Sequence, residues 1–186
     1  MNSNEKNKFE KYKKNKNTKE SIISIILLSL VTVLIQIFVQ NGLNIFSYIG
    51  YGTSPLILLF NFLPIFLVML FGFFVFNRIW AGYILVNIPL SFMLFANQYK
   101  IFFRDEPLKP LDFTIGTEAF SFVGPSELKF DIRLFILVIL VVLIFLYLLF
   151  FIKGKTKNIF IRIIGAVLSV SVFFGLYKLV YTNKQL

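Results

Sequence analysis

Long apolar runs separated by short polar segments dominate the chain. No charged residue occurs from Ser21 to Asn77, from Ile79 to Tyr99, or from Leu134 to Ile152. The hydrocarbon core of a bilayer is about 30 Å thick, so a helix of roughly 20 apolar residues spans it. Helices satisfy their own backbone groups where no water is present. We therefore predict an all-α membrane protein of about five spanning helices, over residues 21–40, 56–76, 80–96, 134–152 and 159–181.

The polar segments define the expected domain organisation. Residues 1–20 are rich in Asn and Lys, a composition that cannot bury a core. We expect them to form a disordered basic cytoplasmic tail before a five-helix transmembrane domain over residues 21–186. The longest polar segment, residues 97–133, is the expected outer loop. Small polar and bulky apolar residues alternate from Phe113 to Val123, which predicts a short amphipathic helix in the outer interface.

Prolines and small residues inside the spans predict features of helix packing. Pro64 and Pro89 each remove a backbone donor, and Asn61 and Asn87 lie close enough to repair the loss. A kinked packing site is the favoured interpretation, and a substrate groove is the alternative. Small residues at a spacing of four, which allow helices to approach closely, recur in the fifth span as Gly165 with Ser169 and Ser171 with Gly175.

The distribution of basic residues predicts the topology. The chain has a formal net charge of +10. With the N-terminus in the cytoplasm, five spans leave twelve basic residues inside and seven outside. Cytoplasmic segments carry an excess of Lys and Arg in membrane proteins. We therefore expect a multi-pass protein of the cell membrane with a cytoplasmic N-terminus and an extracellular C-terminus. The basic tail can also contact anionic lipid.

Composition excludes several kinds of chemistry. The chain has no Cys and no His, so it lacks disulfides, thiolate metal ligands and the commonest general base. The basic residues flank apolar runs, which argues for membrane topology and against a nucleic-acid partner. Transporters usually carry ionisable residues within their spans. The middles of these spans carry none, which argues against ion or proton coupling but leaves a lipid flippase open.

The end of the third span carries the most distinctive pattern in the chain. Its members are Asn97, Tyr99, Lys100, Phe103, Arg104, Pro107, Leu108, Pro110 and Asp112. This pattern resembles a motif in the membrane domain of lipoteichoic acid synthase-like proteins of the alkaline phosphatase/sulfatase superfamily. The five-helix arrangement, with the N-terminus inside and the C-terminus outside, is similar to that family as well.

The resemblance implies a link to phosphoglycerol transfer. In that family a large extracellular catalytic domain follows the membrane domain and transfers glycerol phosphate from phosphatidylglycerol, using a divalent metal and a threonine nucleophile. The sequence ends at Leu186 and carries no counterpart of those groups. Thr53, Thr114 and Thr117 are not surrounded by His or by a carboxylate cluster. We therefore assign no catalytic residue, no metal ligand and no cofactor to this chain.

Lys100 and Arg104 are the candidate lipid-phosphate ligands. They are expected just outside a helix end. There they either anchor the helix to lipid phosphates or pair with Asp105 and Glu106, or they position the phosphate of an anionic lipid for an extracellular active site. The planar guanidinium of Arg suits phosphate because it donates two parallel hydrogen bonds. Asp112 is expected to cap the helix that begins at Phe113. The remaining acids of the loop fit no metal-ligand spacing.

Two functions of different classes follow. The first is a stand-alone or truncated membrane domain of a phosphoglycerol transferase, which binds phosphatidylglycerol or docks a catalytic-domain partner in cell-envelope polymer synthesis. By itself this domain is expected to lack transferase activity. The alternative is a small structural or regulatory membrane protein that binds a protein partner. A decayed gene without function is the third reading.

Overall fold

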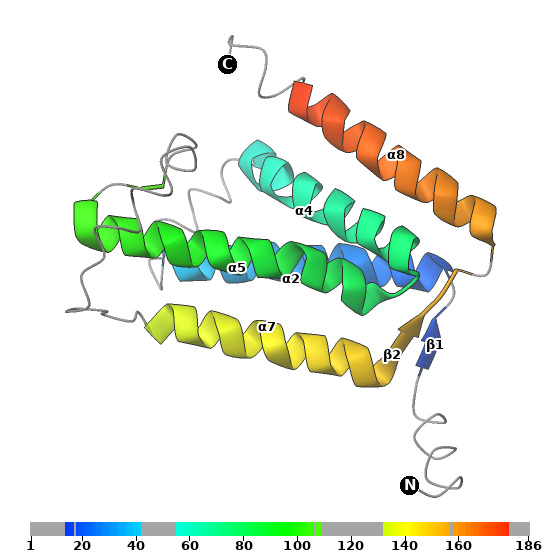
Figure 1. Ribbon diagram of the computed structural model, residues 1–186, viewed down its shortest axis with the longest axis horizontal. Coiled ribbons are helices and arrows are strands. Elements are labelled where there is room, and N and C mark those ends of the chain that lie inside the picture. Colours follow the sequence, from blue (N-terminus) through cyan, green and yellow to red (C-terminus); the bar gives the residue numbers. More distant parts are fainter. Residues whose placement is uncertain are drawn as a thin grey trace, which may run out of the picture.

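Five long helices form an antiparallel array in the computed structural model (Figure 1). The structure describes residues 14–16, 18–41, 55–105, 107–108, 132–156 and 158–178. The elements in chain order are β1 (Lys14–Lys16), α2 (Thr18–Asn41), α4 (Pro55–Phe76), α5 (Ile79–Arg104), α7 (Ile132–Phe151), β2 (Ile152–Gly154) and α8 (Ile159–Tyr177). All five helices are long and apolar enough to cross a membrane. The chain is therefore an all-helical, multi-pass membrane protein, as predicted.

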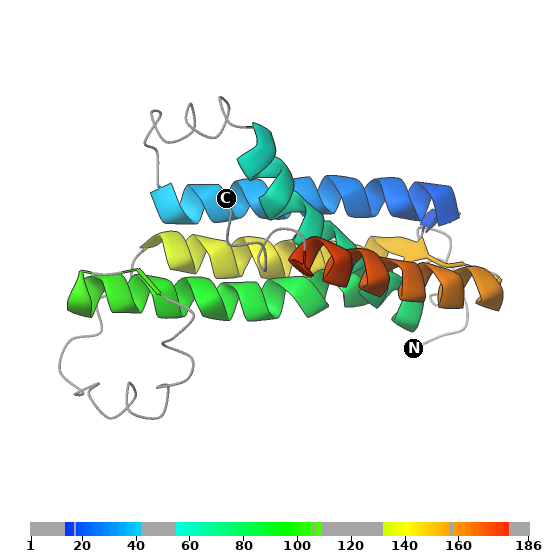
Figure 2. The ribbon, with the colours of Figure 1, turned by 90° about the horizontal axis from the view of Figure 1, so that it is seen from above.

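The array has two ends that we name by their contents. The strand end holds β1, β2 and the first residues of α2, α5 and α8 (Figure 1). The motif end, at the opposite side, holds the last residues of α2 and α5 and the first residues of α7. Helix α4 lies between α2, α5 and α8, whereas α8 packs chiefly on α4 and leaves most of its surface exposed. Figure 2 shows α4 inclined across the more nearly parallel α2, α5 and α7.

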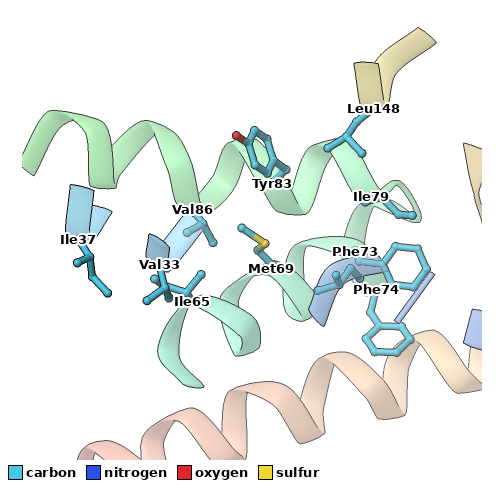
Figure 3. Close-up of a cluster of buried hydrophobic side chains, with 11 residues drawn as sticks. Val33, Ile37, Ile65, Met69, Phe73, Phe74, Ile79, Tyr83, Val86 and Leu148 are labelled. Carbon is cyan, nitrogen blue, oxygen red and sulfur yellow. The ribbon is translucent and has the colours of Figure 1, made fainter. Parts of the chain in front are cut away.

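A buried apolar cluster joins α2, α4, α5 and α7. Met69 and Phe73 of α4 and Tyr83 of α5 belong to this cluster and are almost fully buried (Figure 3). A second cluster at the motif end joins α2, α5 and α7 through Val39, Leu94, Leu134 and Leu137. Lipid tails are as apolar as these side chains, so close packing rather than the hydrophobic effect must hold such helices together.

Glycines permit a close contact between α4 and α5. A Cβ placed on Gly72 of α4 would lie 2.7 Å from the Cα of Gly82 on α5. A Cβ on Gly82 would contact the backbone carbonyl of Met69. The two helices therefore meet backbone to backbone, which the sequence analysis did not identify. The turn between them holds Asn77 in the left-handed region, at a φ of 54°, a conformation that Asn adopts more readily than most residues.

The fifth-span prediction is confirmed at one pair of small residues and wrong at the other. Gly165 packs on the ring of Phe74, where an added Cβ would lie 2.5 Å from a ring carbon. Ser169 is 1% exposed and is the one buried residue of the described helix. Ser171 is exposed, and nothing lies within 4 Å of a Cβ added at Gly175. Helices α8 and α4 separate toward the C-terminus of α8 (Figure 2), so the second pair has no helix to approach among the described residues.

The structure also differs from the predictions at several helix ends and in the tail. Helix α5 continues eight residues beyond Ala96, to Arg104, because long polar side chains are good helix formers and the proline that stops the helix is Pro107. Residues 14–16, expected in a disordered tail, form β1, and α2 begins at Thr18 instead of Ser21. β1 pairs in parallel with β2, from the predicted basic turn. Of the fifth span, residues 179–181 lie outside the described residues.

Asn87 does not repair the proline in its span. Pro89 leaves the Leu85 carbonyl without its helical donor, whereas the Asn87 amide donates to the Tyr83 carbonyl at 2.9 Å. That bond falls within one turn of the helix. Asn61 is exposed. The Asn87 side chain therefore does not fulfil the predicted function.

Tyr83→Phe is expected to stabilise the protein. Tyr83 is 1% exposed, and its hydroxyl finds no hydrogen-bond partner among the described residues. Removing an unsatisfied buried hydroxyl recovers its desolvation cost, so thermal unfolding in detergent should show a gain of about 1 kcal/mol. Tyr147 is exposed, so Tyr147→Phe is the matched control and should leave the stability unchanged. A loss of stability in Tyr83→Phe would show that the hydroxyl has a partner.

Candidate functional site

The last turns of α5 form the candidate site at the motif end. Asn97 and Lys100 are three residues apart, so their side chains lie on the same face of the helix. The helix ends at Asp105, whose φ of 52° is left-handed and whose backbone N–H donates to the Ile101 carbonyl at 2.9 Å. This cap reverses the chain direction. Residues 107–108 consequently return beside the face that carries Asn97 and Lys100.

Two hydrogen bonds hold the returning segment on the helix. The Asn97 Oδ1 accepts from the backbone N–H of Leu108 at 2.8 Å. The Lys100 Nζ donates to the Pro107 carbonyl at 3.2 Å. Four members of the predicted motif are thus brought together by side chain-to-backbone contacts. We call this arrangement, formed by Asn97, Lys100, Pro107 and Leu108, the motif clamp.

A third bond connects the site to α2. The Gln98 Nε2 donates to the Val39 carbonyl at 3.3 Å. Val39 lies in the last turn of α2, where backbone carbonyls lack partners within the helix. Gln98 therefore ties the end of α5 to the end of α2. The sequence analysis did not single it out, although an amide side chain near the end of an apolar span is a recognisable signal for such a cap.

The structure corrects the expected position of the two cations. Lys100 and Arg104 are not outside the helix but within its last two turns, one turn apart. A spacing of four residues places them on neighbouring positions of one helix face. Tyr99 is also a residue of α5. Pro107 is exposed and follows the cap directly. Pro110, Asp112 and the predicted amphipathic helix lie outside the described residues.

The described residues of the motif end show which groups are available there. Within the described part of the chain no three acidic residues come together to hold a metal ion, and the sequence has neither His nor Cys. The site does offer cations and amide groups at the end of a spanning helix.

Asn97→Ala is expected to release residues 107–108 from α5. The Leu108 amide would lose its acceptor, and its hydrogen exchange should accelerate by about fivefold, since one hydrogen bond contributes roughly 1 kcal/mol. Hydrogen–deuterium exchange with mass spectrometry of the detergent-solubilised protein measures this directly. Asn97→Asp keeps an acceptor oxygen and should exchange like the unmodified chain. Equal exchange in all three proteins would show that the motif clamp does not form.

Comparison with known proteins adds no family. No family model matches the chain, and no curated protein or solved structure is significantly similar to it. The functional conclusion therefore depends on the residues and their geometry.

Proposed function

We propose that this chain is a membrane domain that binds the headgroup of an anionic phospholipid, phosphatidylglycerol, at its motif end. Lys100 and Arg104 would hold the phosphate, and the domain would present the lipid to a catalytic partner in phosphoglycerol transfer. The orientation that fits this proposal has the strand end in the cytoplasm and the motif end outside, as the excess of basic residues in the inner segments favours. Catalysis would belong to the partner.

The motif clamp is the observation that carries the proposal. Headgroups lie where spanning helices end, and α5 ends with Lys100 and Arg104 one turn apart. The bond from Lys100 to the Pro107 carbonyl fixes the ammonium beside the returning chain. A preorganised cation binds at a smaller entropic cost than a mobile one. A guanidinium one turn further would add the bidentate geometry that phosphate prefers.

A tryptophan placed at the motif end tests the proposal. Trp80, the one tryptophan of the chain, lies near the strand end, so the probe protein carries Trp80→Phe and Phe135→Trp. Phe135 is exposed in the first turn of α7, at the motif end. Brominated phosphatidylglycerol should quench this probe more strongly than brominated phosphatidylcholine at equal mole fraction. The excess quenching reports enrichment of the anionic lipid.

Lys100→Ala with Arg104→Ala should weaken this preference by about thirtyfold, since each basic residue near a bilayer contributes about 1 kcal/mol. Lys178→Ala with Lys184→Ala removes the same charge from the C-terminal segment and serves as the control, with the preference retained. If the lipid preference survives in the Lys100/Arg104 variant, the lipid proposal is wrong. Loss of a captured protein partner in that variant would then favour the structural or regulatory alternative.

A further inference from the structure

The pairing of β1 with β2 assembles basic residues from two distant parts of the sequence. Lys14 is aligned with Ile152, and Lys16 with Gly154, in a parallel register. The tail lysines therefore lie beside Lys153 and Lys155, almost 140 residues later in the chain. We name the set Lys14, Lys16, Lys19, Arg78, Lys153 and Lys155 the strand-end basic patch. The sequence of the tail alone does not predict that these basic residues lie together.

Hydrogen bonds fix the backbone around this patch. The Thr156 backbone N–H donates to the Asn77 Oδ1 at 2.7 Å, which joins the segment after β2 to the turn between α4 and α5. The Thr18 hydroxyl lies 3.5 Å from that of Thr156, which joins the same segment to the start of α2. Gly154 lies against Ser21 and Ile79, so β2 sits close to both helices. The patch is thus part of the folded bundle.

Charge and position identify the partner. Lys19 and Lys155 are exposed, Arg78 is partly exposed, and Glu20 is the sole acid among the residues that the structure describes at this end. The patch lies where α2, α4, α5, α7 and α8 all terminate (Figures 1 and 2), which is headgroup depth for helices that span a bilayer. We propose that the strand-end basic patch binds anionic phospholipid headgroups of the leaflet that it faces, independently of the motif end.

The native tryptophan reports on this leaflet without modification. Trp80 is the second residue of α5, and its ring contacts Phe145 edge to face at 6.1 Å between centroids. In proteoliposomes, brominated phosphatidylglycerol should quench Trp80 more strongly than brominated phosphatidylcholine at equal mole fraction. The excess should fall with added salt, because exposed charges are screened. Equal quenching by the two lipids would overturn the proposal.

Charge-removing variants test which residues are responsible. Lys16→Gln, Lys19→Gln and Lys155→Gln together should reduce the preference for phosphatidylglycerol by about tenfold, allowing for exposure. The three corresponding Lys→Arg substitutions should restore it. The matched control carries Lys129→Gln, Lys178→Gln and Lys184→Gln, which remove equal charge elsewhere. This control should leave the preference for phosphatidylglycerol intact, and so should Lys100→Ala with Arg104→Ala. An unchanged preference in the first variant overturns the proposal. Equal losses in the first variant and in the matched control would show non-specific charge attraction and overturn it as well.

A cross-link tests the assembly of the patch directly. Asn15 and Lys153 are aligned across the two strands, and the chain has no cysteine. Asn15→Cys with Lys153→Cys should form a disulfide under mild oxidation, since neighbouring strands bring Cα atoms within disulfide range. Asn15→Cys with Lys178→Cys should not. Failure of the first pair to cross-link would show that the two basic segments do not meet.

Discussion

Gly82→Ala is expected to disrupt the packing of α4 on α5 and to lower the free energy of unfolding by about 3 kcal/mol, at the upper end of overpacking costs. The added methyl would contact the carbonyl of Met69 and lie 3.2 Å from the backbone nitrogen of Phe73. Backbone atoms cannot move away by a change of rotamer, so the helices must separate. Alanine favours a helix over glycine by about 1 kcal/mol, which is too little to offset this contact.

Gly175→Ala supplies the matched control for Gly82→Ala. No atom lies within 4 Å of a Cβ at Gly175, so only the helix preference changes. Thermal unfolding in detergent should show stability between unchanged and about 1 kcal/mol higher. If Gly82→Ala and Gly175→Ala behave alike, α4 and α5 do not cross at Gly72 and Gly82.

Arg162→Ala is expected to detach α8 from α4. The Arg162 Nε donates to the Phe74 carbonyl at 3.0 Å, and its Nη2 donates to the Val75 carbonyl at 2.7 Å. Both carbonyls belong to the last turn of α4, where they lack helical partners and where the helix dipole favours a cation. Since α8 packs chiefly on α4, the guanidinium caps one helix and docks the other. Losing both bonds should cost about 2 kcal/mol, after allowance for partial exposure.

Thermal unfolding and protease cleavage between β2 and α8 measure the effect of Arg162→Ala. Arg162→Lys should recover only part of the stability, since an ammonium lacks the planar fork that reaches two carbonyls. Lys178→Ala, an exposed cation at the other end of α8, should leave both readouts unchanged. Full stability in Arg162→Lys would mean that charge alone, without the two-carbonyl geometry, holds the helix.

The five spans could be predicted from sequence because lipid imposes a single rule on the backbone. An uncharged stretch of about 20 residues must form a helix there, and each predicted span coincides with a helix of the structure. The ends of the helices agreed less well with the predicted ends. Lys100 and Arg104 suggested the end of the third span, yet α5 includes both, because charged side chains near a helix end are tolerated when they reach the interface.

The sequence pattern could not predict the contacts between segments that are distant in the chain. Arg162 lies near the start of the predicted fifth span, and only the proximity of α4 and α8 makes it a cap for Phe74 and Val75. The pairing of Lys14–Lys16 with Ile152–Gly154 has no periodicity that could reveal it. At the candidate site, the motif predicted which residues matter, but Asn97 and Lys100 acquired definite partners only when the Asp105 cap returned the chain to α5.

Solid-state NMR measures whether the Arg104 guanidinium contacts a lipid phosphate. The protein carries four arginines, which can be labelled with ¹⁵N and reconstituted in phosphatidylglycerol diluted with a phosphorus-free galactolipid. We predict that lipid ³¹P dephases the ¹⁵N signal of the Arg104 guanidinium. The Arg104→Lys variant should lack this contribution to the dephasing. Identical dephasing with and without Arg104 would show that Arg104 does not contact the lipid phosphate.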